Sequence, residues 1–184
     1  MPEFILDTAG VVSVDTRVSE GRVPGTAYPF VITAWRDLDD FTQGYIEAMF
    51  FTSCDPAGQH DEAAWNPETD CSLPSDVTFS DLAPETLARI VADCAAFQEG
   101  SAWTTCRAAW SEMTDHEARL AGFARGGGVD DAQGGRDFWF TRNGHGCGFW
   151  DGDWPKPHAT ALTDAAKSFG EVDAYLGDDG KVYL

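Results

Sequence analysis

The chain has 184 residues and a formal net charge of −19, because 31 Asp and Glu outnumber 12 Lys and Arg. This charge repels nucleic acid and anionic membranes, so direct binding to either is excluded and a basic protein surface is the favoured partner. An apolar content of 43%, with seven Trp and twelve Phe, is enough to build a buried core. No apolar run approaches the roughly 18 residues of a membrane span, and the N-terminus lacks the regions of a signal peptide, so an intracellular location is expected.

The first part of the chain alternates apolar and polar residues, which predicts strands over residues 4–6, 11–14 and 28–35. From Asp39 or Asp40 the period changes to that of an amphipathic helix, whose apolar face consists of Phe41, Tyr45, Ile46, Met49 and Phe50. Residues 53–79 carry prolines and acids with little periodicity, and they are predicted to form a long acidic loop.

A second helix is predicted around Pro84, with Asp81 ahead of its first turn. Its apolar face consists of Leu87, Ile90, Val91, Cys94 and Phe97. Capping-box spacing at residues 114–117 predicts a further helical segment, which ends at the glycines of residues 126–128.

Aromatic residues in 137–142 and 148–151 flank a glycine-rich segment, and this pattern predicts a hairpin. A helix over residues 160–168 follows and ends before Gly170. A second hairpin is predicted from residues 171–176 and 181–184, with its turn at residues 178–180.

These elements predict an α+β fold with a mainly antiparallel sheet, made of the N-terminal strands plus two C-terminal hairpins, packed against three or four helices. We expect a single domain over residues 1–184. Its parts are a β-rich N-terminal addition (1–36), an acidic helical part with the loop 53–79 (37–125) and a hairpin–helix–hairpin part (129–184).

The acids are concentrated in one stretch, since fourteen carboxylates and one base, Arg89, lie between Asp37 and Glu99. Such a stretch could be a merely solvated surface or a binding surface for a basic protein. The residues predicted to bind are Asp37, Asp39, Asp40, Glu47, Asp55, Asp61, Glu62, Glu68, Asp70 and Asp76. Trp150 and Trp154 join this set, because an aromatic face that is not buried is typical of a protein interface. If Trp150 is buried instead, it is expected to stabilise the core.

An enzyme is the alternative, with Cys147 as nucleophile, His145 as base and Asn143 as the orienting group. The competing interpretation is a structural turn in which the glycines set the backbone and Cys147 packs as a small apolar residue. The five cysteines lack CxxC spacing, no phosphate-binding motif is present, and Cys54, His60 and Cys71 match no zinc spacing. No metal or other cofactor is therefore expected.

Residues 39–51, 81–98, 137–151 and 167–184 resemble segments of a family of small uncharacterised tailed-bacteriophage proteins. The resemblance implies a phage accessory protein in the host cytoplasm, and it assigns no catalytic residue or cofactor. Together with the charge, it suggests binding to a host or phage nucleic-acid-handling protein, with the acidic surface mimicking DNA in a counter-defence or host-takeover role. A virion-associated structural protein is the further alternative.

Overall fold

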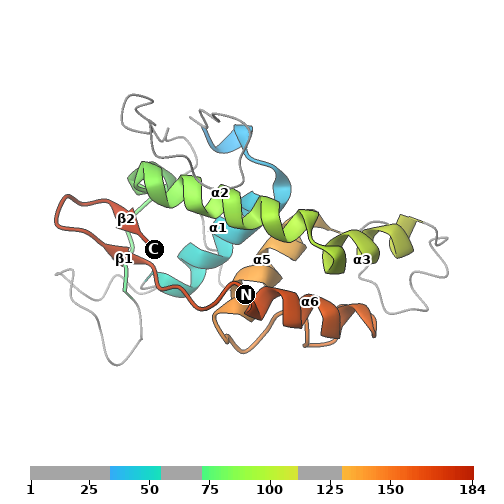
Figure 1. Cartoon of the computed structure of the whole chain (residues 1–184). Coiled ribbons are helices and arrows are strands. Elements are labelled where there is room, and N and C mark those ends of the chain that lie inside the picture. The colour runs from blue at the N-terminus through green and yellow to red at the C-terminus, as the bar shows by residue number, and fades with distance from the viewer. Residues whose placement is uncertain (1–33, 55–71, 112–129) are drawn as a thin grey trace. The chain divides into compact units, whose positions relative to one another are not determined.

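The computed structural model describes residues 34–54, 72–111 and 130–184 of the chain (Figure 1). The α-helices in these ranges are α1 (Asp40–Ser53), α2 (Pro84–Glu99), α3 (Ser101–Ser111), α5 (Asp131–Arg142) and α6 (His158–Lys167). The remaining elements are two 3-10 helices, η1 (Trp35–Asp37) and η2 (Phe79–Asp81), and the antiparallel strands β1 (Tyr175–Leu176) and β2 (Val182–Tyr183). The described part of the chain is therefore mostly helical.

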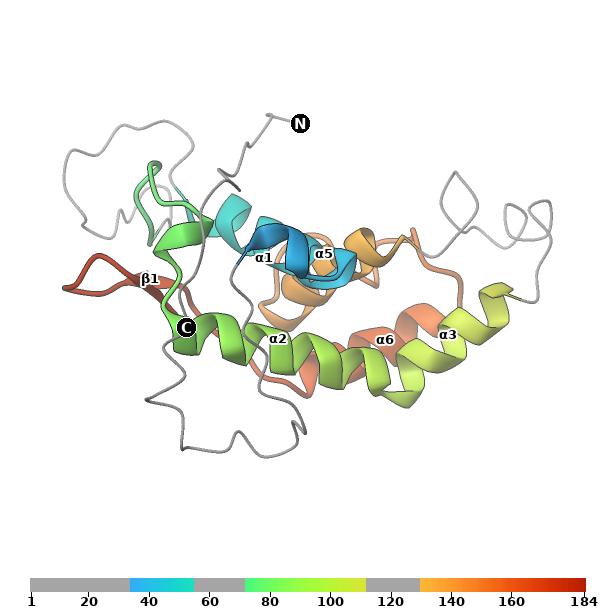
Figure 2. The same ribbon diagram turned by 90° about the horizontal axis from the view of Figure 1, so that it is seen from above.

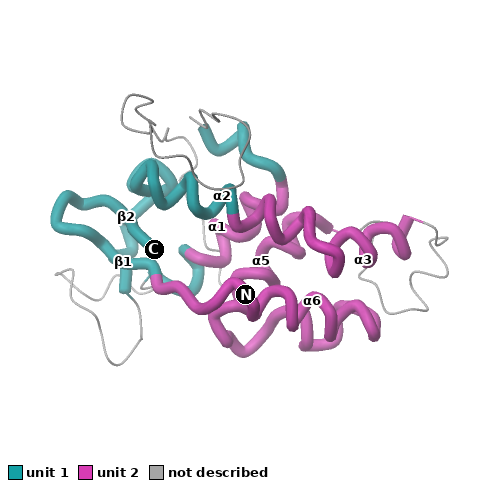
Figure 3. The backbone as a smooth tube through the Cα atoms, viewed as in Figure 1, with its two compact units in different colours: residues 1–39, 50–92, 174–184 teal, residues 40–49, 93–173 magenta. Residues whose placement is uncertain are grey.

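The chain divides into two compact units (Figure 3). Unit 1 comprises residues 1–39, 50–92 and 174–184, and unit 2 comprises residues 40–49 and 93–173. Because the division falls within α1 and within α2, each of these helices contributes residues to both units.

The predicted α+β fold with a mainly antiparallel sheet is wrong. Across the described ranges, β1 and β2 form a single two-stranded sheet. Residues 137–142, predicted as a strand, form the second half of α5, and residues 148–151 lie in bends and turns. The error arises because the buried residues of α5 include Gly134, Gly135, Asp137, Thr141 and Arg142 as well as Phe138 and Trp139, so apolar residues do not recur at helical spacing. Its Phe-Trp-Phe-Thr run then has the composition of a strand.

The ends of α5 did carry helix signals. The Asp130 side chain accepts a hydrogen bond from the Gln133 N–H at 3.1 Å, and Asp followed three residues later by Gln is the spacing of a capping box. At the other end, Asn143 caps the helix and Gly144 has a φ of +68°. A left-handed glycine after the last turn is a common helix terminator.

Several other predicted elements are present in the described residues. α1, α2 and α6 confirm the predicted helices, Gly170 has the positive φ of a helix-ending glycine, and β1 with β2 confirms the last hairpin. Trp35, predicted at the end of a strand, lies instead in η1. The rest of the N-terminal strands, residues 55–71 of the acidic loop, and the segments at 114–117 and 126–128 lie outside the described residues.

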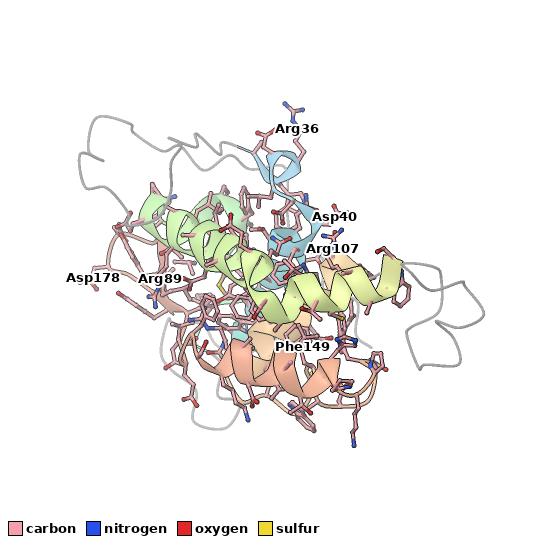
Figure 4. The ribbon with its side chains drawn as sticks, turned by 45° about the vertical axis from the view of Figure 1, so that its right-hand side comes forward. Arg36, Asp40, Arg89, Arg107, Phe149 and Asp178 are labelled. Atoms are coloured by element: carbon pink, nitrogen blue, oxygen red, sulfur yellow. The ribbon has the colours of Figure 1, made fainter. Side chains whose placement is uncertain are left out.

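The core of unit 2 is built from stacked aromatic rings. The Phe97 ring stacks on Phe138 and on Phe149, with ring centroids 4.3 Å and 5.5 Å apart. Figure 4 labels Phe149 among the packed side chains, whereas Arg36 of unit 1 points away from the ribbon. Helix α6 packs against α5 and α3, which Figure 2 shows from above. Aromatic side chains bury large areas, so this cluster supplies much of the driving force for folding unit 2.

Glycines let α1 and α5 approach each other closely within unit 2. A Cβ added to Gly135 would collide with the backbone carbonyl oxygen of Phe41, and one added to Gly44 would collide with that of Ala132. Backbone atoms cannot move aside as a flexible side chain can, so any larger residue would force the two helices apart.

Arg142, at the end of α5, is a buried charge that donates four hydrogen bonds. Its guanidinium donates to Asp93 Oδ2 at 2.9 Å, to the Tyr45 hydroxyl at 2.9 Å and to the carbonyl oxygens of Phe169 and Gly170 at 3.1 and 2.9 Å. A buried cation is tolerated when it is paired and hydrogen-bonded in this way. Within unit 2, Arg142 therefore fixes the end of α6 to α5 and to residues of α1 and α2.

The C-terminal hairpin is attached to η2 and to the start of α2 within unit 1. Val182 is fully buried, forms a bridge with Leu82, and accepts a hydrogen bond from the Ala83 N–H at 3.0 Å. Lys181 Nζ donates to the Ser80 carbonyl at 3.0 Å, and the exposed Arg89 donates to that of Leu184 at 3.1 Å. The last residues of the chain are therefore held by η2 and the first part of α2.

Candidate interaction surface

The segment that follows α5 is fixed to that helix by a glycine and a threonine. The Phe149 N–H donates to Thr141 Oγ1 at 3.0 Å. Gly148 has a φ of +143°, and a Cβ there would collide with the same Oγ1 atom. Only glycine reaches both this backbone conformation and this close approach without strain.

Asp151 closes the turn that starts at Gly148. The Asp151 N–H donates to the Gly148 carbonyl at 3.2 Å, and its carboxylate accepts from the N–H groups of Gly148 and Asp153 at 3.3 and 3.4 Å. Side chains of Asp often stabilise turns through bonds to nearby backbone groups. The backbone from 148 to 153 is therefore held by its own hydrogen bonds.

The aromatic residues in and after this turn differ in how far they are buried. Phe149 has 0% of its surface exposed and Trp154 has 6%, whereas Trp150 has 53%. Of the two tryptophans predicted to bind a partner, Trp150 is thus presented at the surface and Trp154 is part of the core. The interpretation of Trp150 as a core residue does not hold.

Trp154 is held inside by Asp137, a buried carboxyl group in the middle of α5. The indole Nε1 donates to Asp137 Oδ2 at 2.6 Å, and Gln133 Nε2 donates to Oδ1 at 2.8 Å. Burial raises the pKa of Asp137 to about 6; the two hydrogen bonds oppose this shift, and the carboxylates of Asp151 and Asp153 add to it. Sequence reasoning missed this role of Asp137. The spacing of four between Gln133 and Asp137 would have indicated the contact once α5 was known to be a helix.

Two residues of the predicted Cys/His site, Asn143 and His145, have other partners in the structure. Asn143 uses its amide at both ends, since Nδ2 donates to the Trp139 carbonyl at 3.0 Å and Oδ1 accepts from the Val172 N–H at 2.8 Å. The His145 ring packs edge-on against Phe140, with centroids 5.9 Å apart. Asn143 therefore secures the backbone rather than orienting an imidazole.

The surroundings of Cys147 oppose a thiolate. Partial burial raises the pKa of this thiol, and the carboxylates of Asp137 and Asp151 raise it further. A cysteine nucleophile needs the reverse, a pKa lowered by a nearby cation or helix N-terminus. The geometry and the charges therefore favour the structural turn over the enzyme.

The predicted acidic binding residues divide between described and undescribed parts of the chain. Asp37, Asp39, Asp40 and Asp76 are exposed, and Glu47 is half-buried and forms an ion pair with Arg136 at 3.2 Å. The members outside the described residues are Asp55, Asp61, Glu62, Glu68 and Asp70. Four members of the predicted set are thus on the surface, and they come from η1, the start of α1 and the turn before η2.

The described residues taken together expose an excess of negative charge. Fourteen Asp and Glu are exposed there, against five Lys and Arg. Some of the cations are already engaged, since Arg107 pairs with Asp131 at 3.3 Å and the half-buried Arg136 with Glu47. The described cations are therefore too few to neutralise most of the exposed carboxylates.

Within ranges 34–54, 72–111 and 130–184, His, Cys, Asp and Glu side chains nowhere gather in a group of three or more that could hold a metal ion. None of the helices described is long and apolar enough to cross a membrane.

Comparisons with protein-family models, with curated proteins and with solved structures find no match to this chain.

Proposed function

We propose that this protein is a bacteriophage accessory protein that binds a basic, nucleic-acid-handling protein of the host or the phage through its acidic surface. The observation that carries the proposal is the excess of fourteen exposed carboxylates over five exposed cations in the described residues. A protein surface that binds DNA phosphates offers the complementary charge. Occupying that surface would serve a counter-defence or host-takeover role, because the partner would lose access to DNA.

A more specific version of this proposal is that the acidic surface mimics DNA. Duplex DNA carries about one charge per 1.7 Å of its axis, so a mimic must present carboxylates at a comparable density along one face. Asp37, Asp39 and Asp40 lie within four consecutive residues and are all exposed, which supports a high local density at this point of the chain.

A titration with an arginine-rich peptide tests the charge-based binding. The purified full chain is added to a labelled peptide of alternating Arg and Gly, and fluorescence anisotropy gives the affinity between about 50 and 200 mM salt. The test variant is D37N/D39N/D40N/D76N, and the control variant D164N/E171Q/D173N/D178N removes the same charge from other exposed positions.

We expect the parent to bind with an affinity that falls steeply with salt, and the test variant to bind on the order of tenfold more weakly, with a smaller loss in the control. No binding by the parent, or equal losses in the two variants, would contradict a surface centred on residues 37–99. A virion-associated role stays a separate prediction, which mass spectrometry of purified particles decides.

A further inference from the structure

The described surface exposes a large aromatic side chain, Trp150, as well as acidic residues. Two other large apolar side chains are well exposed there, Phe51 and Tyr175, and Tyr175 stacks on Tyr183 with centroids 5.7 Å apart. Within ranges 34–54, 72–111 and 130–184, no other ring and no guanidinium lies against the Trp150 indole. An exposed tryptophan costs solubility and is the residue type most enriched among the energetic anchors of protein interfaces.

The indole is presented by a backbone that is already ordered. Its neighbour Phe149 is fully buried and bonds to Thr141, and the Gly148–Asp151 turn is closed by hydrogen bonds on both sides of Trp150. A partner that packs on this ring therefore does not have to order the loop, which removes a large part of the usual entropic cost of binding.

The charges around the ring define the chemistry of that partner. Asp151 and Asp153 are both exposed and lie one and three residues after Trp150, while Lys156 is the one cation in residues 148–157. Indole has the most favourable ring face for a cation, and a guanidinium can stack on it while its N–H groups reach a carboxylate. A lysine ammonium lacks the planar fork needed for both contacts at once.

We propose that Trp150 is an anchor for the basic partner and receives one of its arginine side chains, with the guanidinium over the indole and its N–H groups directed to Asp151 or Asp153. This inference rests on the proposed function. It names a specific contact that would add to the general attraction between an acidic surface and a basic partner. Asp151 retains acceptor capacity for this contact, because a carboxylate can accept about four hydrogen bonds.

The test uses the full chain labelled with 5-fluorotryptophan and the same alternating Arg-Gly peptide, together with a peptide in which citrulline, a neutral analogue of equal shape, replaces arginine. The Trp150 resonance in the fluorine spectrum is the one that is lost in Trp150→Phe. Affinity is measured for the parent, Trp150→Ala, Trp150→Phe and Asp153→Asn. Phe51→Ala is the matched control, because it removes another exposed ring.

We expect the arginine peptide to shift the Trp150 resonance, and Trp150→Ala to bind about 5- to 20-fold more weakly. Trp150→Phe should retain part of the affinity, Phe51→Ala nearly all of it, and the citrulline peptide should bind poorly to every form. If the parent binds but Trp150→Ala binds equally well and the resonance stays in place, the anchor is refuted while the acidic surface stands. Equal binding of the citrulline peptide refutes the arginine assignment. No binding by the parent removes the proposed function and this inference together.

Discussion

Asp137 combines full hydrogen bonding with an unfavourable location for a charge. Both of its oxygens accept hydrogen bonds, yet it is 2% exposed and its pKa is about 6, against about 3.9 for the unfolded chain. Between these two values the unfolded chain has lost the proton while the folded protein still holds it. The free energy of unfolding contributed by this group is therefore fully present below pH 4 and is lost as the pH rises through 6.

Replacing the carboxyl with an amide should remove this pH dependence. We predict that the difference in free energy of unfolding between the parent and Asp137→Asn falls by about 2 kcal/mol from pH 4 to pH 7, as measured by urea denaturation. Asp164→Asn, at an exposed position of α6, controls for the loss of one charge. Parallel curves for the parent and Asp137→Asn would show that the carboxyl group is ionised in the folded protein throughout this range.

Phe149 and Trp150 are adjacent in sequence but should differ sharply in their effect on stability. Phe149 is fully buried, so Phe149→Ala should lower the free energy of unfolding by about 3 to 5 kcal/mol. Trp150→Ala removes a half-exposed ring and should cost less than about 1 kcal/mol. Thermal melting of the two variants checks this order, and a Trp150→Ala protein that melts as early as Phe149→Ala would place the indole in the core.

At the scale of elements, the close packing of α1 on α5 depends on glycine more than on side chains. Gly135→Ala would improve the intrinsic helix propensity of α5 by roughly 1 kcal/mol, but its Cβ would collide with the Phe41 carbonyl. We predict a net loss of about 1 to 3 kcal/mol, measured by chemical denaturation. Gly146→Ala is the control, since a Cβ there meets nothing within 4 Å. Equal stability of the two variants would mean that α1 and α5 do not approach so closely.

Sequence patterns predicted those helices whose buried face is apolar, and failed for α5, whose buried face also carries glycines and polar residues. The spacing of Phe41, Tyr45 and Met49 predicted α1, and that of Leu87, Ile90 and Cys94 predicted α2, because each of these residues is buried on one side of its helix. Helix α5 contains two buried glycines and a buried arginine, and its tertiary contacts outweigh its local strand-like composition. Its caps, Asp130 and Asn143, were the remaining signals.

The candidate site was predictable only in part, for a similar reason. Composition identified the acidic surface, because most charged side chains must remain in water. It could not separate Trp150 from Trp154, because that distinction depends on the Asp137 carboxyl, which lies 17 residues before Trp154 and accepts its indole N–H. Such a contact can be predicted from the sequence only after residues 131–142 are recognised as a helix.

At the scale of the whole molecule, the proposed function requires that the acidic surface take the place of DNA on a basic protein. The direct measurement is displacement from immobilised DNA at constant ionic strength. Proteins of a bacterial lysate are bound to DNA-cellulose, and the purified full chain or its D37N/D39N/D40N/D76N variant is passed over the column. We predict that the parent releases a discrete DNA-binding protein and forms a complex with it, while the variant releases much less. Release of nothing by the parent, or equal release by the variant, would contradict the claim.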